Sequence, residues 1–496
     1  MGKRLILILT FAFVIGMVAG AYAEVQNVKV SGDILMEGIG RYDLTLRKTD
    51  AVPPGGTVGA QYGQNIGTFL SHVRVRVDAD LTDNVSATVR LLNERTWDTE
   101  TSTSTDIDLD LAYATMKEFL YSPLTLTVGR QELHFGNDFI MGDVDTSSLM
   151  AGHNAGGVTA ANGSILPNSI DDLSLRKSFD AIRATLNYDP LVVDAVFARI
   201  SKTINSDNGV NLWGVNANYA LRKDTTVEAY YWLKKRDKVS TGTAIVGPVE
   251  DYNGSHNDTV NTIGGRVQNT TIKNLTVGLE AAYQFGNKMN STVLYPDDLS
   301  NDGGYRHRKA WAMQFTSKYS LADLVKKYDP MIAFNYTLLS GDSWKRNAKN
   351  YGGWDPMYHN QAVGTLFNKI LGYTNAQFFN VSSSAKPMSD LTLSLDYYYI
   401  RLMRAFRATN GGITSTVAVN LSGVGGDPTY NMKANENSLG NEIDAKLIYD
   451  YTEDVQLGLN LGWFITGDAF AKNDGGTTGG NKETASQIIG SMKVTF

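Results

Sequence analysis

Apolar and polar residues alternate with a period of two in many segments of the chain after residue 24. The clearest segment is 455–463, in which polar or small residues alternate with Val455, Leu457, Leu459, Leu461 and Trp463. The same alternation recurs at 73–78, 107–113, 275–284 and 391–399. Successive side chains of a β-strand point to opposite faces, so each segment of about ten residues is typical of a strand with one apolar face. The pattern predicts an all-β protein, either a transmembrane β-barrel or a soluble β-sandwich.

We count eighteen such segments, which begin near residues 28, 68, 84, 106, 124, 177, 190, 210, 224, 258, 274, 307, 329, 373, 390, 439, 454 and 484. Short and long connections alternate between them, and the long ones include 47–67, 135–176, 236–257, 286–306, 342–371, 405–438 and 468–483. This layout is typical of a transmembrane antiparallel up-and-down β-barrel with short periplasmic turns and long extracellular loops. We therefore expect about eighteen strands, and the even number places both termini on the periplasmic side.

Aromatic residues near the strand ends favour the barrel over the sandwich. Those in the apolar phase are Tyr188, Tyr219, Tyr319 and Tyr449 on the periplasmic side, and Tyr231, Tyr283, Trp311 and Trp463 on the outer side. Two such girdles are expected where rings lie at the lipid headgroups. The last segment ends in Phe496, which resembles the signal read by the outer-membrane assembly machinery. We therefore expect the bilayer and that machinery to be partners of this chain.

The first residues predict export. A short basic stretch with Lys3 and Arg4 precedes the apolar stretch 5–19, and Ala21-Tyr22-Ala23 has the small-x-small pattern of a cleavage site. We expect a signal peptide at 1–23 and a single barrel domain at 24–496. The alternative, a membrane anchor, would need a longer apolar stretch of about 18 residues. The expected location is the outer membrane of a Gram-negative-type (diderm) bacterium.

Composition narrows the chemistry. The chain has 45 Lys and Arg against 51 Asp and Glu, a net charge of −6, so nucleic acid is not an expected partner. It has no cysteine, which excludes thiolate chemistry and disulfides. The six histidines are scattered, and neither a Gly-x-Ser-x-Gly elbow nor a phosphate-binding loop is present. We expect no enzymatic activity, and a Ser/His hydrolase built on the barrel is the enzyme alternative.

Two paired motifs carry a family resemblance. Gly129-Arg130-Gln131-Glu132-Leu133-His134-Phe135-Gly136 is followed, after a long loop, by 176–183, which reads Arg-Lys-Ser-Phe-Asp-Ala-Ile-Arg. Near the end, 439–444 leads to 462–470. The chain resembles the alginate-export porin family in these motifs and in its topology. The resemblance implies an eighteen-stranded monomeric barrel that passes a hydrophilic, often anionic solute, and for the family's namesake an acidic polysaccharide.

Charged residues in the inward phase are the expected pore lining. The basic ones are Arg74, Arg76, Arg90, Arg183, Arg266 and Lys446. The acidic ones are Asp106, Asp108, Asp110, Glu228, Glu280, Glu442 and Asp444. Pairing about the turn 81–84 sets Arg74 or Arg76 opposite Arg90, beside the acidic ladder 106–110. Such a wall creates a transverse field that orients dipolar solutes. Alternatively, these charges form salt bridges that only stiffen the barrel.

Arg130 is in the outward phase, where a charge at membrane depth is costly. A β-bulge at Gly129 would return Arg130 to the lumen. Alternatively, Arg130 lies at the outer rim and pairs with Asp180, anchoring the base of the loop 135–176. We favour the rim pairing.

The loop 135–176 is the expected constriction element because it is long and glycine-containing. Asp138, Asp143 and Asp145 carry oxygen ligands of the kind that Ca²⁺ prefers, although the full calcium-loop pattern is absent. These residues are alternatively solvated loop positions, and we expect no other cofactor or metal.

The sequence thus predicts a porin that passes hydrophilic solutes, anionic ones or polysaccharide included, down a gradient. The alternative is a structural or adhesive barrel whose lumen is closed and whose long loops bind a partner.

Overall fold

The computed structural model describes residues 27–46, 65–97, 107–144, 170–202, 209–236, 258–289, 305–343, 349–406, 416–419, 430–471 and 482–496. The signal peptide predicted at 1–23 lies outside these residues and stays a prediction. No helix in the described part of the chain is long and apolar enough to cross a bilayer.

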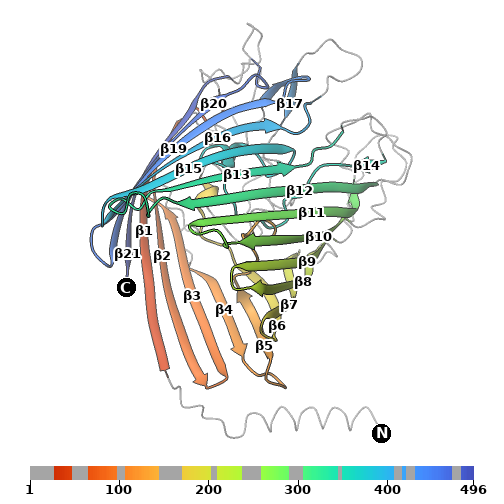
Figure 1. Ribbon diagram of the computed structural model, residues 1–496, viewed down its shortest axis with the longest axis vertical. Coiled ribbons are helices and arrows are strands. Elements are labelled where there is room, and N and C mark those ends of the chain that lie inside the picture. The colour runs from red at the N-terminus through yellow and green to blue at the C-terminus, as the bar shows by residue number, and fades with distance from the viewer. Residues whose placement is uncertain are drawn as a thin grey trace.

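Among the described residues, eighteen antiparallel strands close into one barrel (Figure 1). In chain order they are β1 (Asn27–Tyr42), β2 (Asn65–Thr82), β3 (Val85–Thr96), β4 (Asp108–Met116), β5 (Leu124–Gln131), β6 (Phe179–Asn187), β7 (Leu191–Lys202), β8 (Gly209–Arg222), β9 (Thr225–Arg236), β10 (Asp258–Asn269), β11 (Leu275–Met289), β12 (Tyr305–Ser320), β13 (Met331–Leu339), β15 (Ala376–Met388), β16 (Leu391–Leu402), β19 (Ser438–Asp450), β20 (Val455–Thr466) and β21 (Ala485–Thr495). Pairing of β1 with β21 closes the ring, so no strand edge is left unpaired in the membrane.

A few short elements lie outside this ring of strands. They are β14 (Asn350–Tyr351), which pairs in parallel with β12, the hairpin β17 (Thr416–Val419) and β18 (Tyr430–Lys433), the 3₁₀ turn η1 (Asp171–Leu173) and the helix α2 (Phe367–Ile370). The sequence did not predict them, because each is too short to carry a periodic signal.

The predicted barrel is confirmed. Each predicted strand start lies within three residues of an observed one. Tight connections such as that between β8 and β9 lie at one rim, which we call the short-turn rim, together with Asn27 and Phe496. The other end is the long-loop rim. In an outer-membrane barrel these two rims face the periplasm and the exterior, respectively.

The outward face carries the predicted aromatic girdles. On β9 to β12, Ile263 lies opposite both Tyr231 and Tyr283, and Tyr283 lies opposite Trp311. These three aromatic side chains are exposed, which in a membrane means exposed to lipid. Tyr188, Tyr219 and Tyr319 are exposed near the short-turn rim. These two sets of aromatic residues therefore mark the two edges of the apolar band that faces the lipid.

One predicted strand face is wrong. The sequence pattern placed Ile107, Leu109, Leu111 and Tyr113 on the same side. In the structure, the register of β3 and β4 shifts between Arg90 and Leu91, so that Leu91 pairs with Leu109 and Arg90 with Leu111. Asp110 is the extra residue of this β-bulge, and Leu111 is buried while Leu109 is exposed. A bulge moves one residue out of alternation and so turns the rest of the strand over.

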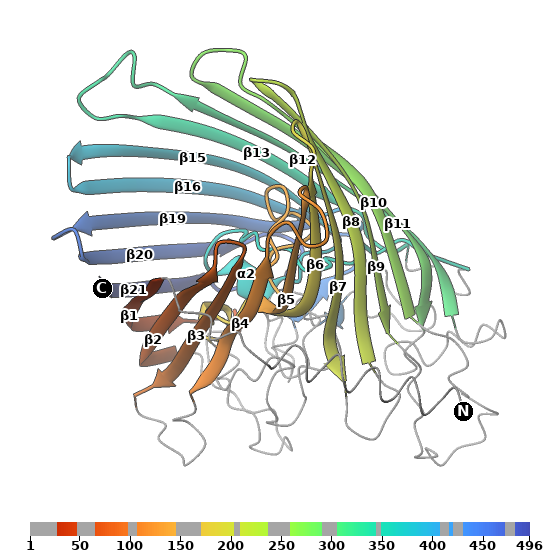
Figure 2. The same cartoon turned by 90° about the horizontal axis from the view of Figure 1, so that it is seen from below.

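Three segments fold into the barrel from the long-loop rim. We call 132–144 the first, 170–178 the second and 349–375 the third inner segment. Figure 2 shows α2, part of the third, inside the ring of strands. Their apolar side chains contact inward residues of the wall, as Phe135 does with Trp232 (ring centroids 5.0 Å apart) and Phe367 with Phe464 (5.1 Å). An apolar core therefore fills part of the barrel near the long loops.

Candidate functional site

Charged residues occupy the middle of the inner wall, between the apolar core and the short-turn rim. Along β2 the inward positions run from Leu70, which is fully buried near the long loops, through His72 and Arg74 to Arg76 and Asp78. The side chains of Arg76 and Asp78 are 37% and 34% exposed. Inward residues that keep this much exposure inside a closed barrel face water, so this stretch of the wall borders an aqueous interior.

The predicted facing of like charges is present. Arg76 is the register partner of Arg90, whereas Arg74 lies opposite Leu92. Each arginine has acidic partners that relieve the repulsion. Arg76 forms two hydrogen bonds with Asp78 (2.7 and 2.9 Å). Arg90 donates to Asp110 at 2.5 Å and to Glu132 at 2.6 Å.

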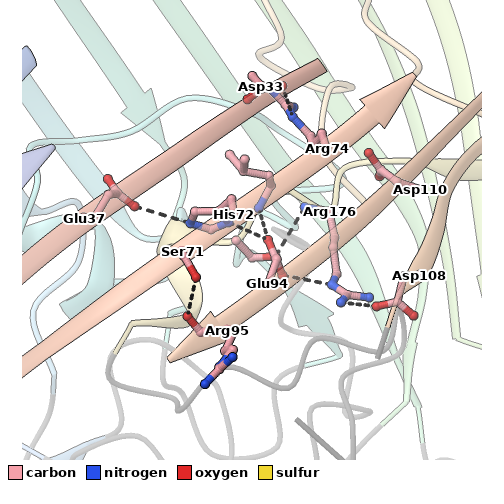
Figure 3. A network of polar contacts seen from close by, with 12 residues as sticks. Asp33, Glu37, Ser71, His72, Arg74, Glu94, Arg95, Asp108, Asp110 and Arg176 are labelled. Carbon is pink, nitrogen blue, oxygen red and sulfur yellow. Dashed lines mark hydrogen bonds and ion pairs between the residues drawn. The ribbon is translucent and has the colours of Figure 1, made fainter. Parts of the chain in front are cut away.

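Arg74 and its surroundings are drawn in Figure 3. Arg74 donates from Nε and Nη2 to the two carboxylate oxygens of Asp33 on β1, at 2.8 and 2.9 Å. Two parallel bonds of this kind fix the plane of the guanidinium group. The charges of this wall are thus held in place by their neighbours, which supports the stiffening alternative for part of the set.

A buried network joins the second inner segment to the wall (Figure 3). Glu94 of β3 accepts hydrogen bonds from the backbone N–H of Leu175 (2.6 Å) and from Arg176 Nε (2.9 Å). Arg176 also pairs with Asp108, one of the predicted acidic residues. On the other side of Glu94, His72 lies between Glu94 and Glu37, its ring nitrogens 3.3 and 3.4 Å from their carboxylates. Asp108 therefore anchors an inner segment through Arg176.

The first inner segment brings further charges to the water-facing wall. Burial raises the pKa of Glu132, but the hydrogen bond and charge of Arg90 outweigh it and lower the pKa overall. His134 contacts Asp138 at 3.0 Å, and this hydrogen bond raises the pKa of His134. His134 is 44% exposed, so its charge is felt by solutes as well as by Asp138.

The first and third inner segments form one folded unit. The N–H of Tyr358 donates to Ile140 O (2.9 Å), and the N–H of Gly142 donates to Tyr358 O (2.7 Å). Lys177, from the second segment, bonds Asn360 Oδ1 at 2.6 Å. The two backbone bonds satisfy groups that would otherwise be buried without partners, and the Lys177 bond joins the second inner segment to this unit.

Asp355 fastens the third inner segment to the wall. Its carboxylate lies 2.5 Å from Lys234 Nζ and 3.8 Å from Arg308 Nη2. Burial raises the pKa of Asp355, but the two cations outweigh it and bring the pKa to about 2. In the same segment the His359 ring stacks on Tyr373 (4.0 Å), and burial lowers the pKa of His359 to about 3. The segment thus carries an ionised Asp355 and a neutral His359 at pH 7.

Two predicted acidic residues on β19 are anchors of the same segment. The carboxylate of Glu442 accepts the backbone N–H groups of Thr365 (2.6 Å), Leu366 (2.7 Å) and Phe367 (2.8 Å), at the start of α2. Asp444 accepts from Thr365 Oγ1 at 2.8 Å. These two residues face inward as predicted, but in the structure they hold a folded segment.

The remaining predicted wall residues lie on other strands. Arg266 is the register partner of both Glu228 and Glu280, with ion-pair distances of 3.7 and 4.0 Å. Arg183 pairs with Asp194 at 2.8 Å. Lys446 is exposed on β19. Asp106 lies outside the described residues.

Arg130 and Asp180 are direct register partners on β5 and β6. The pairing shows no shift around Gly129, so the alternative bulge is absent there and Arg130 stays in the outward phase. Within the described part of the chain, no ion pair joins the two side chains, so the rim anchor stays a prediction.

The calcium site also stays a prediction. Asp138 contacts His134, and Asp143 lies 3.3 Å from Lys177 Nζ. Asp145 lies outside the described residues, among which no group of three His, Asp or Glu side chains is placed to hold a metal ion.

The third inner segment was not predicted, because most of it lies in the range 342–371, which was expected to be a long loop. A signal was present in Trp354, Tyr358, Phe367 and Ile370, which are too apolar for a loop in water. Lys234 and Arg308 were not predicted as site residues, because their partner Asp355 lies in that loop.

The closed barrel with a charged interior defines the class of this chain, an outer-membrane channel barrel. The chain belongs to the alginate export family, whose model, described as "Alginate export", matches residues 44–481. As a member of this family it is an outer-membrane porin for hydrophilic solutes.

Several solved structures share the fold. OccK3 (OpdO) of Pseudomonas aeruginosa has a TM-score of 0.52 and 12% identity, covering 97% of this chain and 98% of that one. OpdQ of Pseudomonas aeruginosa has a TM-score of 0.51 and 10% identity, covering 95% and 98%. OccAB1 of Acinetobacter baumannii has a TM-score of 0.50 and 10% identity, covering 96% and 99%. At these identities the likeness establishes the fold alone. No curated protein matches the sequence.

Proposed function

We propose that this porin selects hydrophilic solutes that carry a carboxylate, saccharide acids above all. The proposal rests on the exposure of Arg76. Its side chain points into the barrel, is 37% exposed, and lies opposite Arg90 in the pairing of β2 with β3. Arg90 is buried against Asp110 and Glu132, so Arg76 is the arginine of this pair that meets water. Arg76 bonds Asp78 through Nε and Nη2, which leaves Nη1 as a donor toward the carboxylate of a solute.

The acids of the same wall support saccharides over simple anions. Asp78 and Glu132 are 34% and 36% exposed and lie beside Arg76 and Arg90. Carboxylates accept hydrogen bonds from hydroxyl groups, so a sugar acid would meet cations for its charge and acceptors for its hydroxyls. The transverse field between the two kinds of group would orient the solute as it passes.

A second candidate is the closed structural or adhesive barrel, with partner-binding loops. It is favoured by a specific observation, because the three inner segments bury an apolar core inside the wall. Such a core narrows the interior from the long-loop rim, and full closure would leave no route for solutes.

Solute uptake separates the two candidates. Proteoliposomes are placed in isotonic glucuronate, glucose or longer uronate oligomers, and the initial swelling rates are compared. The proposal predicts several-fold faster entry of glucuronate than of glucose, and the oligomers measure how long a saccharide passes. Equal rates for the two monomers would leave an unselective porin, and no swelling at all would favour the closed barrel.

We further propose the expected export and assembly route: removal of 1–23 as a signal peptide and recognition of Phe496 by the assembly machinery. Phe496 supports this, because its N–H and C=O bond Gly32 at the seam between the first and last strands (3.0 and 2.8 Å). Phe496 as a residue is 61% exposed in the finished barrel. The proposal assigns transport to the inner wall, and no catalysis.

A further inference from the structure

A row of charged residues crosses the outer surface of the barrel near the long-loop rim. On β5 to β7, which lie side by side in Figure 1, Val128, Ile182 and Phe197 are register partners and are exposed on the outward face. Two residues nearer the long loops, the same face carries Arg130, Asp180 and Arg199, again in register. We call these three residues the outer charged row.

The outer charged row holds two cations for one anion. No ion pair within the described residues satisfies Arg130, Asp180 or Arg199, although the strands place them next to one another. Arg130 Nε is buried and has no hydrogen-bond partner. Arg130 therefore has a buried N–H group that makes no hydrogen bond, and the exposed Arg199 lies on the strand after next. Together they offer several hydrogen-bond donors to an external acceptor.

The height of the outer charged row fixes what can reach it. The row of apolar side chains next to it continues through Trp213, whose ring lies 5.6 Å from that of Phe197, to Leu233. Leu233 is two residues nearer the long loops than Tyr231 of the outer aromatic girdle. Aromatic girdles lie at the headgroup level, so the charged row faces lipid headgroups. Arginine at this depth is stabilised by lipid phosphates, which it binds through two parallel hydrogen bonds.

Further cations lie in the outward phase near the long-loop rim. The charged row continues through Asn211 to Lys235 on β9. Around the barrel, Lys309 is exposed beside Trp311, and Arg401 Nε is buried without a hydrogen-bond partner. The outward surface at the long-loop rim is therefore basic, although the whole chain carries a net charge of −6.

We propose that Arg130 and Arg199 form a binding site for a phosphorylated glycolipid of the outer leaflet. The two guanidinium groups, two strands apart and so about 10 Å from each other along the sheet, would bind phosphate groups of the lipid headgroup. Asp180 lowers the affinity, because it repels phosphate from the middle of the site. The site does not depend on what the lumen passes.

Native mass spectrometry of the folded protein in detergent tests the site. The probes are a bisphosphorylated glycolipid of the lipid A type, its dephosphorylated form and phosphatidylglycerol. We expect the bisphosphorylated form to bind at least tenfold more tightly than either of the others. Arg130→Gln/Arg199→Gln should lose that preference, whereas Asp180→Asn should bind several-fold more tightly. Arg222→Gln, which removes an exposed cation at the short-turn rim, is the matched control and should match the unmodified protein.

Three results would overturn the proposal. They are equal binding of the phosphorylated and dephosphorylated glycolipids, equal binding of phosphatidylglycerol, or a double variant that behaves like Arg222→Gln. Folding of each variant is checked by the heat-dependent shift of the barrel on an SDS gel. If the double variant does not fold, the single variants Arg199→Gln and Asp180→Asn are sufficient to test the site. The proposal requires the affinity for the phosphorylated glycolipid to fall in Arg199→Gln and to rise in Asp180→Asn.

Discussion

Asp355 and Lys234 form an ion pair of 2.5 Å that ties the third inner segment to the wall of the barrel at β9. Arg308 of β12 adds a second cation at 3.8 Å from the same carboxylate. The fold of the interior thus depends on a charge in a loop and on two charges in distant strands.

Asp355→Asn should loosen the third inner segment without preventing barrel closure. The substitution removes the charge that Lys234 contacts at 2.5 Å, whereas Arg308 keeps its closer partner Asp258 at 2.7 Å. Losing one partner of a buried ion pair costs about 3–5 kcal/mol in the free energy of unfolding. Thermal melting measures the loss, and single-channel recordings should show larger and noisier currents. Asp323→Asn breaks the fully exposed pair with Lys273 and should change neither measurement. Equal melting of both variants would contradict the anchoring role.

The same residue predicts sensitivity to acid. The pKa of Asp355 is lowered from 3.8 to about 2, so its contribution to stability is complete above about pH 4 and is lost as the pH falls toward 2. Melting temperatures of the unmodified protein should fall over this range. The Asp355→Asn variant should show a smaller fall, and parallel curves would assign the acid sensitivity elsewhere.

Glu442→Gln should free the start of α2. The carboxylate accepts three N–H groups, from Thr365 to Phe367, and an amide presents one acceptor oxygen in place of two. We expect faster hydrogen exchange at these amides and a loss of about 1–3 kcal/mol in stability. Gly364→Ala should act in the same way, since Gly364 has φ +68° and a Cβ there would lie 2.3 Å from the Glu442 carboxyl carbon. Unchanged exchange in both variants would exclude Glu442 as the anchor.

His134 should make the channel more anion-selective in mild acid. The hydrogen bond to Asp138 raises the pKa of His134 above its ordinary value of 6.5, so His134 is positively charged in mild acid and loses the charge as the pH rises through that raised pKa. The anion-to-cation permeability ratio, taken from reversal potentials, should be about twofold higher at pH 5.5 than at pH 8. His134→Gln should flatten this dependence. A slope that survives the substitution would place the titrating group elsewhere.

Phe496→Ala should slow barrel assembly more than it destabilises the finished barrel. The ring packs on Gly32, where a Cβ would come within 2.6 Å of it, and the backbone bonds at the seam do not need the side chain. In cells we expect less folded protein in the outer membrane, with a melting temperature near that of the unmodified protein. A large drop in melting temperature would make the role of Phe496 structural.

The strands were predictable because their signal is local. Alternation and turn length depend on neighbours in the chain. The short turn at 83–84, together with the register shift between Asp80 and Thr82, sets Arg76 opposite Arg90. The bulge at Asp110 was not predictable, because it depends on pairing with β3 and on Arg90, which holds its carboxylate.

The inner segments escaped prediction for a different reason. Trp354 and Phe367 do not alternate with polar residues, and their partners are wall residues far away in sequence. The sequence therefore placed Glu442 and Asp444 on the inward face correctly but gave no indication that a loop would use them.

Single-channel recording with the Arg76→Gln variant tests the central claim most directly. In a planar bilayer, uronate trimers should block the unmodified channel more strongly than neutral trimers of equal length. Arg76→Gln should weaken uronate block by about fivefold, roughly 1 kcal/mol, and leave neutral block unchanged. Arg222→Gln should match the unmodified channel. Equal block by charged and neutral trimers, or uronate block that survives Arg76→Gln, would contradict selection of carboxylates at Arg76.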